Sequence, residues 1–137
     1  MITTIDAQAF LEANFATWVL DLRPRVVRCD ADGLDLNIPV TDAIARVGGI
    51  VSGQALAALA DTAMVLAAGA HQGRMLPVAT VTLDTQFLRP GRGEVVRASA
   101  HVLRAGRSMI FARCTLSTRP SDKAIAHATA TCAVPPG

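Results

Sequence analysis

The sequence contains few aromatic residues and little charge for its length. Aromatic residues make up 4% of the 137 residues, tyrosine is absent, and charged residues make up 18%. Alanine, valine and leucine must therefore supply most of the packing surface, which favours close contact between helix and sheet. A hydrophobic content of 51% argues against disorder, and the length predicts one domain over residues 1–137.

A strong excess of charge of either sign is also missing. The formal net charge is +2, which is too small to indicate nucleic-acid binding by bulk electrostatics. The N-terminus lacks a basic segment followed by a long apolar run, and Asp6 and Glu12 fall where a signal peptide would be apolar. We therefore expect a cytoplasmic protein without a nucleic-acid partner.

Closely spaced cysteines and histidines are absent as well. These residues are spread along the chain as Cys29, Cys114, Cys132, His71, His101 and His127. No pair has the spacing of a metal knuckle or a redox motif. The sequence predicts buried free thiols, with no metal and no redox cofactor.

One long apolar segment dominates what is present. After the glycine-rich stretch 48–54, residues 55–68 are apolar on every face of a helix except at Asp61, and Gly69 is a plausible stop. A membrane span needs about 20 apolar residues, and this run is shorter and carries a carboxylate near its middle. We therefore expect a core helix at about 52–69, enclosed by protein, and no membrane partner.

The remaining chain predicts a sheet around this helix. A short amphipathic helix is expected at about 4–15 as a brace or lid, and residues 41–49 are expected as a loop. Alternating segments are expected as strands at residues 25–30, 34–40, 80–87, 96–102, 108–118 and 124–134. In the first strand after the helix, strict alternation places Thr80 with Thr82 on the face opposite Leu83. Short turns join the later strands, so the fold class is α+β with a mainly antiparallel sheet.

Asp61 is unexpected in an apolar core helix, because it carries a charge. Its neighbours one turn away are apolar and offer no partner, and desolvating a carboxylate costs several kcal/mol or more. Either a partner comes from another element, or the group is kept for chemistry. Upstream, Ser52 and Gly53 mark the helix start, where free N–H groups could polarise a carbonyl oxygen. A base and an oxyanion site on one helix would suit attack on an acyl carbon.

Three motifs after residue 46 occur together in one known family. They are Ser52-Gly53-Gln54 followed by Leu59-Ala60-Asp61-Thr62-Ala63, then Thr80-Val81-Thr82-Leu83 running into Phe87-Leu88-Arg89-Pro90, and finally Val102-Leu103-Arg104-Ala105-Gly106-Arg107-Ser108. With these motifs, residues 46–134 resemble the hotdog-fold acyl-CoA thioesterases, specifically the phenylacetate-pathway (PaaI-like) branch.

The resemblance implies a fold, an assembly and a set of roles. It implies a curved sheet wrapped around the central helix, dimers whose sheets join edge to edge, and often tetramers of two such dimers. It assigns Asp61 as general base or nucleophile and the Gly53 N–H as oxyanion donor. It also assigns Thr80, contributed across the dimer interface, to hold the attacking water. Coenzyme A enters as part of the substrate, and no separate cofactor is implied.

The chain differs from the family pattern around the helix start. The family usually has His-Gly-Gly where this chain has Ser52-Gly53-Gln54, and often asparagine where this chain has Arg46. Ser52 could cap the helix or act in catalysis. Gln54 could bond the substrate carbonyl or face a partner subunit. Arg46 could bind substrate, or neutralise Asp61 and prevent its action as a base.

Arginines flank two of the predicted turns. Arg89 and Arg92 border one turn, and Arg104, Arg107 and Ser108 border another. Arginine forks and turn amides suit phosphate oxygens, although solvated surface arginines are equally compatible with the pattern. In the family that the chain resembles, the second turn commonly lies near the nucleotide end of coenzyme A.

The resemblance and the residues together predict hydrolysis of an acyl-CoA thioester. The alternative is a non-catalytic hotdog module that binds an acyl-CoA, which the altered Ser52 and Gln54 keep open. A hydratase or dehydratase on the same fold ranks below both, because such enzymes pair an acidic residue with a histidine and no histidine precedes the helix.

Overall fold

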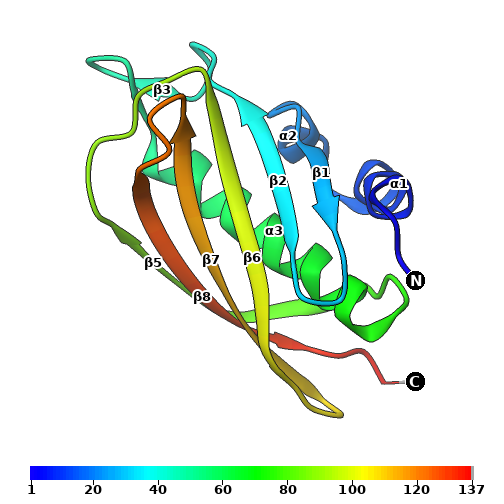
Figure 1. The fold of residues 1–137 in the computed structure, drawn as a ribbon. Coiled ribbons are helices and arrows are strands. Elements are labelled where there is room, and N and C mark those ends of the chain that lie inside the picture. The colour runs from blue at the N-terminus through cyan, green and yellow to red at the C-terminus, as the bar shows by residue number, and fades with distance from the viewer. Residues whose placement is uncertain (137) are drawn as a thin grey trace.

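The computed structural model describes residues 1–136 as an antiparallel sheet wrapped around one long helix (Figure 1). The helices are α1 (Thr4–Asn14), α2 (Thr17–Leu20) and α3 (Gly53–Gln72). The strands are β1 (Arg25–Cys29), β2 (Leu34–Pro39), β3 (Ala45–Arg46), β4 (Ile50–Val51), β5 (Ala79–Phe87), β6 (Val95–Ala105), β7 (Met109–Arg119) and β8 (Ala124–Ala133).

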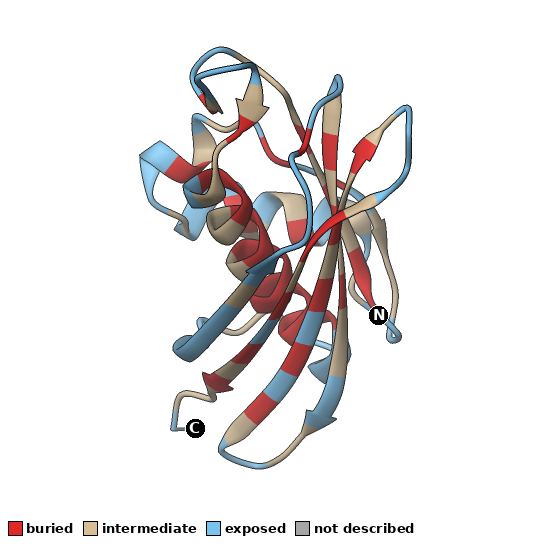
Figure 2. Ribbon diagram, turned by 90° about the vertical axis from the view of Figure 1, so that its left-hand side faces the viewer, coloured by how far each residue is buried: buried red, intermediate tan, exposed pale blue. Residues whose placement is uncertain are grey.

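The main sheet has six strands in the order β1-β2-β6-β7-β8-β5, and every neighbouring pair is antiparallel. Its inner face is lined by small side chains, including Ala98, Ala100, Ala112, Ala128 and Ala130, each at most 4% exposed. These let the backbone of the sheet approach the alanine-rich α3 closely. Figure 2 shows the result as buried residues along the helix and at alternating strand positions. The predicted hotdog fold is confirmed.

The central helix begins where the sequence predicts but ends later. The Ser52 hydroxyl caps its N-terminus by accepting from the Ala55 N–H at 3.2 Å. Gly69 does not stop the helix, because it is enclosed in the core, where a Cβ would lie 2.9 Å from the Met75 side chain. The helix instead runs to Gln72 and ends at Gly73, whose φ of +78° is the left-handed conformation that glycine adopts readily.

By length and composition α3 could cross a membrane, but 72% of its 18-residue apolar window is buried inside the fold. It is therefore the core helix that the sequence predicts. The carboxylate Asp61 lies on the part of the helix that the sheet leaves half-exposed.

The N-terminal segment forms two helices rather than one. The predicted helix at 4–15 is confirmed as α1, which begins with a reciprocal capping box between Thr3 and Asp6. Its buried residues Ala7 and Leu11 pack with the core, and α1 lies beside β1 (Figure 1). The short α2 was not predicted, because four residues are too few to show a helical period.

The predicted loop at residues 41–49 is partly wrong. It contains β3, which pairs with β4 through Ala45 opposite Val51 and Arg46 opposite Ile50. Two residues per strand leave too short an alternation to recognise in sequence. This small hairpin leads directly into the start of α3.

Candidate active site

A short hydrogen bond links the carboxylate of α3 to the first strand after it. The Thr80 hydroxyl donates to Asp61 Oδ1 at 2.6 Å. Thr80 is exposed and Asp61 is half-exposed, so both groups remain open to water or to a ligand. The partner that the apolar helix requires for Asp61 is therefore a neutral hydroxyl, which leaves the carboxylate able to accept a further proton donor.

A β-bulge brings Thr80 to the helix side of the sheet. The register between β5 and β8 shifts at Val81: Thr80 pairs with Cys132, while Thr82 pairs with Thr131 and Leu83 with Ala130. Cys132 and Ala130 are buried, inward-facing residues, so Thr80 and Leu83 share the inner face. The prediction that Thr80 lies opposite Leu83 is wrong, because the extra residue of the bulge reverses the alternation.

The hydroxyl comes from the same chain as the carboxylate. The resemblance implied that Thr80 would be supplied across a dimer interface. In the single chain, the 2.6 Å hydrogen bond already joins Thr80 to Asp61 without a partner subunit. The reason is topological: β5 follows α3 directly, and its bulged beginning passes beside the middle of the helix.

Cys132 lies next to Thr80 on the adjacent strand β8, and sequence analysis did not identify it. Its thiol is fully buried opposite Thr80. Burial raises the pKa of Cys132 and the negative charge of Asp61 raises it further, while the Thr80 hydroxyl opposes the rise. The thiol is therefore neutral near pH 7. Only the register of β5 against β8 reveals this position.

The other cysteines lie away from the site. Cys114 is buried and Cys29 is half-buried, and all three thiols are free, so burial of the thiols is confirmed for Cys114 and Cys132. Desolvation raises the pKa of Cys114 to about 12. Within residues 1–136, no group of three or more histidine, cysteine, aspartate or glutamate side chains is arranged to hold a metal ion.

A cavity of about 400 Å³ opens beside the hydrogen-bonded pair. It lies between the N-terminal helices and α3, and its lining residues are Phe10, Asn14, Phe15, Ala16, Trp18, Val19, Ala58, Asp61, Thr62, Val65, Pro77, Val78 and Thr80. Among the described residues, Asp61 is the single charged side chain of this lining. A concave apolar site with a few polar groups at one end is the usual form of a small-molecule site.

Gly53 lies apart from this cavity. It is eight residues before Asp61, or about 12 Å along the helix axis at 1.5 Å per residue. Gly53 lines a separate shallow hollow with Gln54, Ala57 and Phe87. The Phe87 ring packs so closely that a Cβ on Gly53 would lie 3.1 Å from it. Within one chain, Gly53 and Asp61 are therefore too far apart to contact the same reacting group of a ligand.

The start of α3 nevertheless offers free donors. The Ser52 hydroxyl accepts from Ala55 and the Ser52 carbonyl accepts from Leu56. The N–H groups of Gly53 and Gln54 precede the first turn and have no acceptor in the part of the chain that the structure describes. The Ser52 hydroxyl serves as the helix cap, and the Gln54 side chain is exposed.

Arg46 makes no ion pair with Asp61 among residues 1–136. It lies exposed in the β3–β4 hairpin, where it pairs with Ile50. Within one chain, Arg46 therefore does not neutralise the carboxylate.

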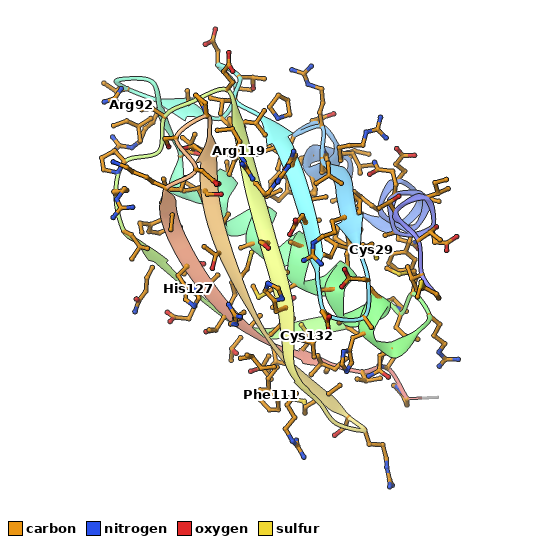
Figure 3. All side chains as sticks on the ribbon, viewed as in Figure 1. Cys29, Arg92, Phe111, Arg119, His127 and Cys132 are labelled. Atoms are coloured by element: carbon orange, nitrogen blue, oxygen red, sulfur yellow. The ribbon has the colours of Figure 1, made fainter. Side chains whose placement is uncertain are left out.

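The two groups of arginines lie at opposite ends of the sheet. Arg89 donates to the Ala124 carbonyl at 2.6 Å, and Arg92 donates to the Gly48 carbonyl. Arg104 and Arg107 are exposed at the β6–β7 hairpin. The 11 residues of β6 separate the groups by about 35 Å at 3.3 Å per residue. Figure 3 shows Arg92 at one end of the sheet and Phe111, near the hairpin, at the other.

Of the two turns that carry arginines, the β6–β7 hairpin lies at the same end of the sheet as Asp61. Ser108, which is exposed at its tip, accepts a backbone hydrogen bond from Val134 at 2.9 Å. Val134 follows β8, whose last residues pair with the beginning of β5, where Thr80 lies. The loop with Arg89 and Arg92 instead lies at the Gly53 end, since Val51 donates to the Gly91 carbonyl.

The family model described as "Thioesterase superfamily" matches residues 48–125. None of the curated proteins matches the sequence significantly.

Solved structures share the whole fold. A protein of Silicibacter sp. TM1040 described as a candidate thioesterase is 24% identical, with a TM-score of 0.88 over 99% of this chain and 94% of that chain. A thioesterase from Haemophilus influenzae is 21% identical, with a TM-score of 0.86 over 98% and 92% of the two chains. Zebrafish thioesterase superfamily member 2 is 21% identical, with a TM-score of 0.84 over 98% and 100%. At 21–24% sequence identity, this structural similarity establishes the fold alone.

Proposed function

This chain belongs to the thioesterase superfamily, and from that premise we propose that it hydrolyses an acyl-CoA thioester to a free acid and coenzyme A. The observation that carries the proposal is the Thr80–Asp61 hydrogen bond at the edge of an apolar cavity. A carboxylate oriented by a hydroxyl, and open to water on one side, is suited to general base catalysis.

The chemistry follows from these two side chains. Asp61 accepts a proton from a water molecule that the Thr80 hydroxyl helps to hold, and the water oxygen attacks the thioester carbonyl carbon. The C–S bond then breaks, and the leaving thiolate receives the proton from Asp61. Direct attack by the Asp61 carboxylate, followed by hydrolysis of the anhydride, is the alternative route with the same products.

We propose that a second subunit supplies the oxyanion donor. β5 is an edge strand of nine residues, and Val81, Leu83 and Phe87 on it are each at least 39% exposed. Its beginning carries Thr80 and its end packs on Gly53. Antiparallel pairing of two β5 strands would bring the beginning of one next to the end of the other, and so place Asp61 near Gly53 of the partner subunit.

The β6–β7 hairpin is the proposed contact for the nucleotide end of coenzyme A. Arg104, Arg107 and Ser108 are exposed there, on the Asp61 side of the sheet. Guanidinium groups bind phosphate oxygens in bidentate fashion. We further propose that the protein acts in the cytoplasm, where a reducing environment keeps its three thiols free.

The test is turnover by the wild type and by Asp61→Asn. Because asparagine keeps the size of aspartate but cannot take the proton, we expect the rate of acyl-CoA hydrolysis to fall by about 10²–10⁴-fold. Release of coenzyme A from a panel of acyl-CoAs measures the rate, and thermal unfolding of the variant provides the control for folding.

Two results would contradict the proposal. Full activity of Asp61→Asn would remove Asp61 from the mechanism. A wild type that is stabilised by an acyl-CoA without turnover would instead be a binding module, which the use of Ser52 as a helix cap and the cover of Phe87 over Gly53 also fit.

A further inference from the structure

We propose that α1 and α2 build the acyl pocket of this enzyme and restrict it to uncharged, apolar acyl groups of short to medium length, with Trp18 as the main specificity-determining residue. This inference rests on the proposed function, since it names the substrate class for the same site.

The position of the cavity identifies which part of the substrate it holds. Asp61 and Thr80 lie at its edge, so a group inside it is directly attached to the carbon that water attacks. That group is the acyl chain. The coenzyme A moiety extends from the other side of the carbonyl, toward the exposed arginines of the β6–β7 hairpin.

The charges around the cavity exclude an acidic acyl group. No arginine, lysine or histidine of the described chain lines it, and its single charged group is the carboxylate of Asp61. A second carboxylate on the acyl chain would be desolvated beside a like charge without a compensating donor. Asn14 is the one amide of the lining, and its Nδ2 already donates to the Phe10 carbonyl at 2.9 Å.

The aromatic side chains indicate an apolar ligand. Phe10, Phe15 and Trp18 supply one wall, and the first two rings pack edge to face with centroids 6.5 Å apart. Trp18 lines the cavity yet remains 59% exposed. An acyl chain in the cavity would cover this exposed ring, which makes Trp18 the residue with the most apolar surface to bury on binding.

The pocket wall lies outside the segment that the family model matches. The family model matches residues 48–125, whereas Phe10, Phe15 and Trp18 all precede residue 48. The catalytic pair lies inside the matched region and the acyl wall lies outside it. A volume of about 400 Å³ is near the lower end of the 300–1,000 Å³ range of small-molecule sites, so it fits a short to medium acyl chain.

The first experiment measures binding without turnover. Trp18 is the only tryptophan of the chain, so its fluorescence reports directly on the proposed wall. Asp61→Asn protein is titrated with octanoyl-CoA, acetyl-CoA and free coenzyme A. We expect a blue shift of the emission with octanoyl-CoA alone. An identical spectrum with all three ligands would place the acyl chain elsewhere and overturn the inference.

The second experiment measures specificity by kcat/KM. For the wild type we expect a rise of about fourfold per methylene from acetyl-CoA to octanoyl-CoA, corresponding to the transfer free energy of about 0.8 kcal/mol per buried CH₂. We expect a lower value for palmitoyl-CoA and little hydrolysis of succinyl-CoA. Trp18→Ala should lower the ratio of octanoyl-CoA to acetyl-CoA hydrolysis at least tenfold.

A matched control lies on the neighbouring helix α1. Ile5 on α1 is 78% exposed and does not line the cavity, so Ile5→Ala should leave the ratio unchanged. Succinyl-CoA as the preferred substrate, or an unchanged ratio in Trp18→Ala, would overturn the inference while the thioesterase proposal stands. Absence of turnover with every acyl-CoA would instead refute the proposed function, and the fluorescence titration would still test the pocket.

Discussion

At the scale of single residues, the site depends on one hydroxyl and one carboxylate. The Thr80 hydroxyl lies 2.6 Å from Asp61 only because a bulge at Val81 turns it inward. Hydrogen bonds to charged groups contribute about 1.5–3 kcal/mol, so a modest change in this contact should be visible in the rate of hydrolysis.

Replacing Thr80 tests this contact. Thr80→Val keeps the shape of the side chain and removes the hydroxyl, so we expect kcat to fall by about 10–100-fold. Thr80→Ser restores the hydroxyl and should recover most of the rate. Steady-state kinetics with the preferred acyl-CoA measures both. Equal rates for the valine variant and the wild type would remove Thr80 from the site.

A second charged contact stabilises the outer face of the sheet. Asp35 accepts from Arg28 Nε at 3.1 Å and from the Ser99 hydroxyl at 2.6 Å. Burial works to raise the pKa of Asp35, but the hydrogen bonds from Arg28 and Ser99 and the positive charge of Arg28 hold it below its ordinary value of 3.8. Since the folded pKa is lower than the unfolded one, the carboxylate stabilises the fold above about pH 4. That stabilisation is lost as the pH falls through the folded pKa.

Asp35→Asn should therefore show a pH-dependent loss of stability. At pH 7 we expect the free energy of unfolding to decrease by about 1–2 kcal/mol, since one acceptor of a partly buried network loses its charge. Urea unfolding at pH 7 and pH 3 measures the difference, which should shrink at the lower pH. Asp42→Asn, at an exposed carboxylate, is the control and should show no such change. A difference that grows toward pH 3 would contradict a lowered pKa for Asp35 in the folded state.

At the scale of elements, α3 carries both halves of the proposed chemistry but at separate places. Its N-terminus has N–H groups at Gly53 and Gln54 that find no acceptor within residues 1–136, and its middle carries Asp61. The cap by Ser52 fixes where the helix begins, and so which N–H groups stay free.

Ser52→Ala distinguishes a cap from a catalytic serine. We expect a loss of about 1 kcal/mol in the free energy of unfolding, with kcat within about twofold of the wild type. Ser52→Asp, which can also cap, should retain the stability. Chemical unfolding and steady-state kinetics provide the two readings. A loss of kcat without a loss of stability would instead assign Ser52 to the reaction.

At the scale of the whole molecule, the sheet has two unlike edges. β1 is covered in part by α1, whereas β5 is exposed along most of its length. An exposed nine-residue edge strand with apolar side chains is a template for pairing with another strand. A second copy of the chain is the proposed partner, because its Gly53 would also complete the site around Asp61.

Leu83→Lys tests this assembly. Leu83 is the central residue of β5, so in an antiparallel self-pairing it lies close to the two-fold axis and two lysines would face each other. We expect the dimer dissociation constant to rise at least 100-fold and hydrolysis to fall in parallel. Analytical ultracentrifugation measures the first quantity and kinetics at matched protein concentration the second.

The control for this variant lies on the opposite edge of the sheet. Val27 on β1 is 43% exposed, and Val27→Lys should change neither assembly nor activity. A fully active monomer of Leu83→Lys would show that one chain suffices for hydrolysis, and would contradict the shared site.

The sequence by itself determined the architecture. The apolar run, the alternating segments and Asp61 inside the run predict a core helix with one functional carboxylate, because periodicity and the cost of desolvating a charge act locally. The motifs around Gly53 and Asp61 also indicated the family that the match at residues 48–125 establishes.

Only the tertiary structure decided how the site is assembled. Four features depend on contacts between distant segments: the bulge that turns Thr80 inward, the wall that Trp18 adds to the cavity, the burial of Cys132 next to Thr80, and the separation of Gly53 from Asp61. Strand register and helix docking are set by packing of the whole core, and one inserted residue reverses which side chains face inward. The sequence therefore identified the chemical groups, and the fold determined which of them meet.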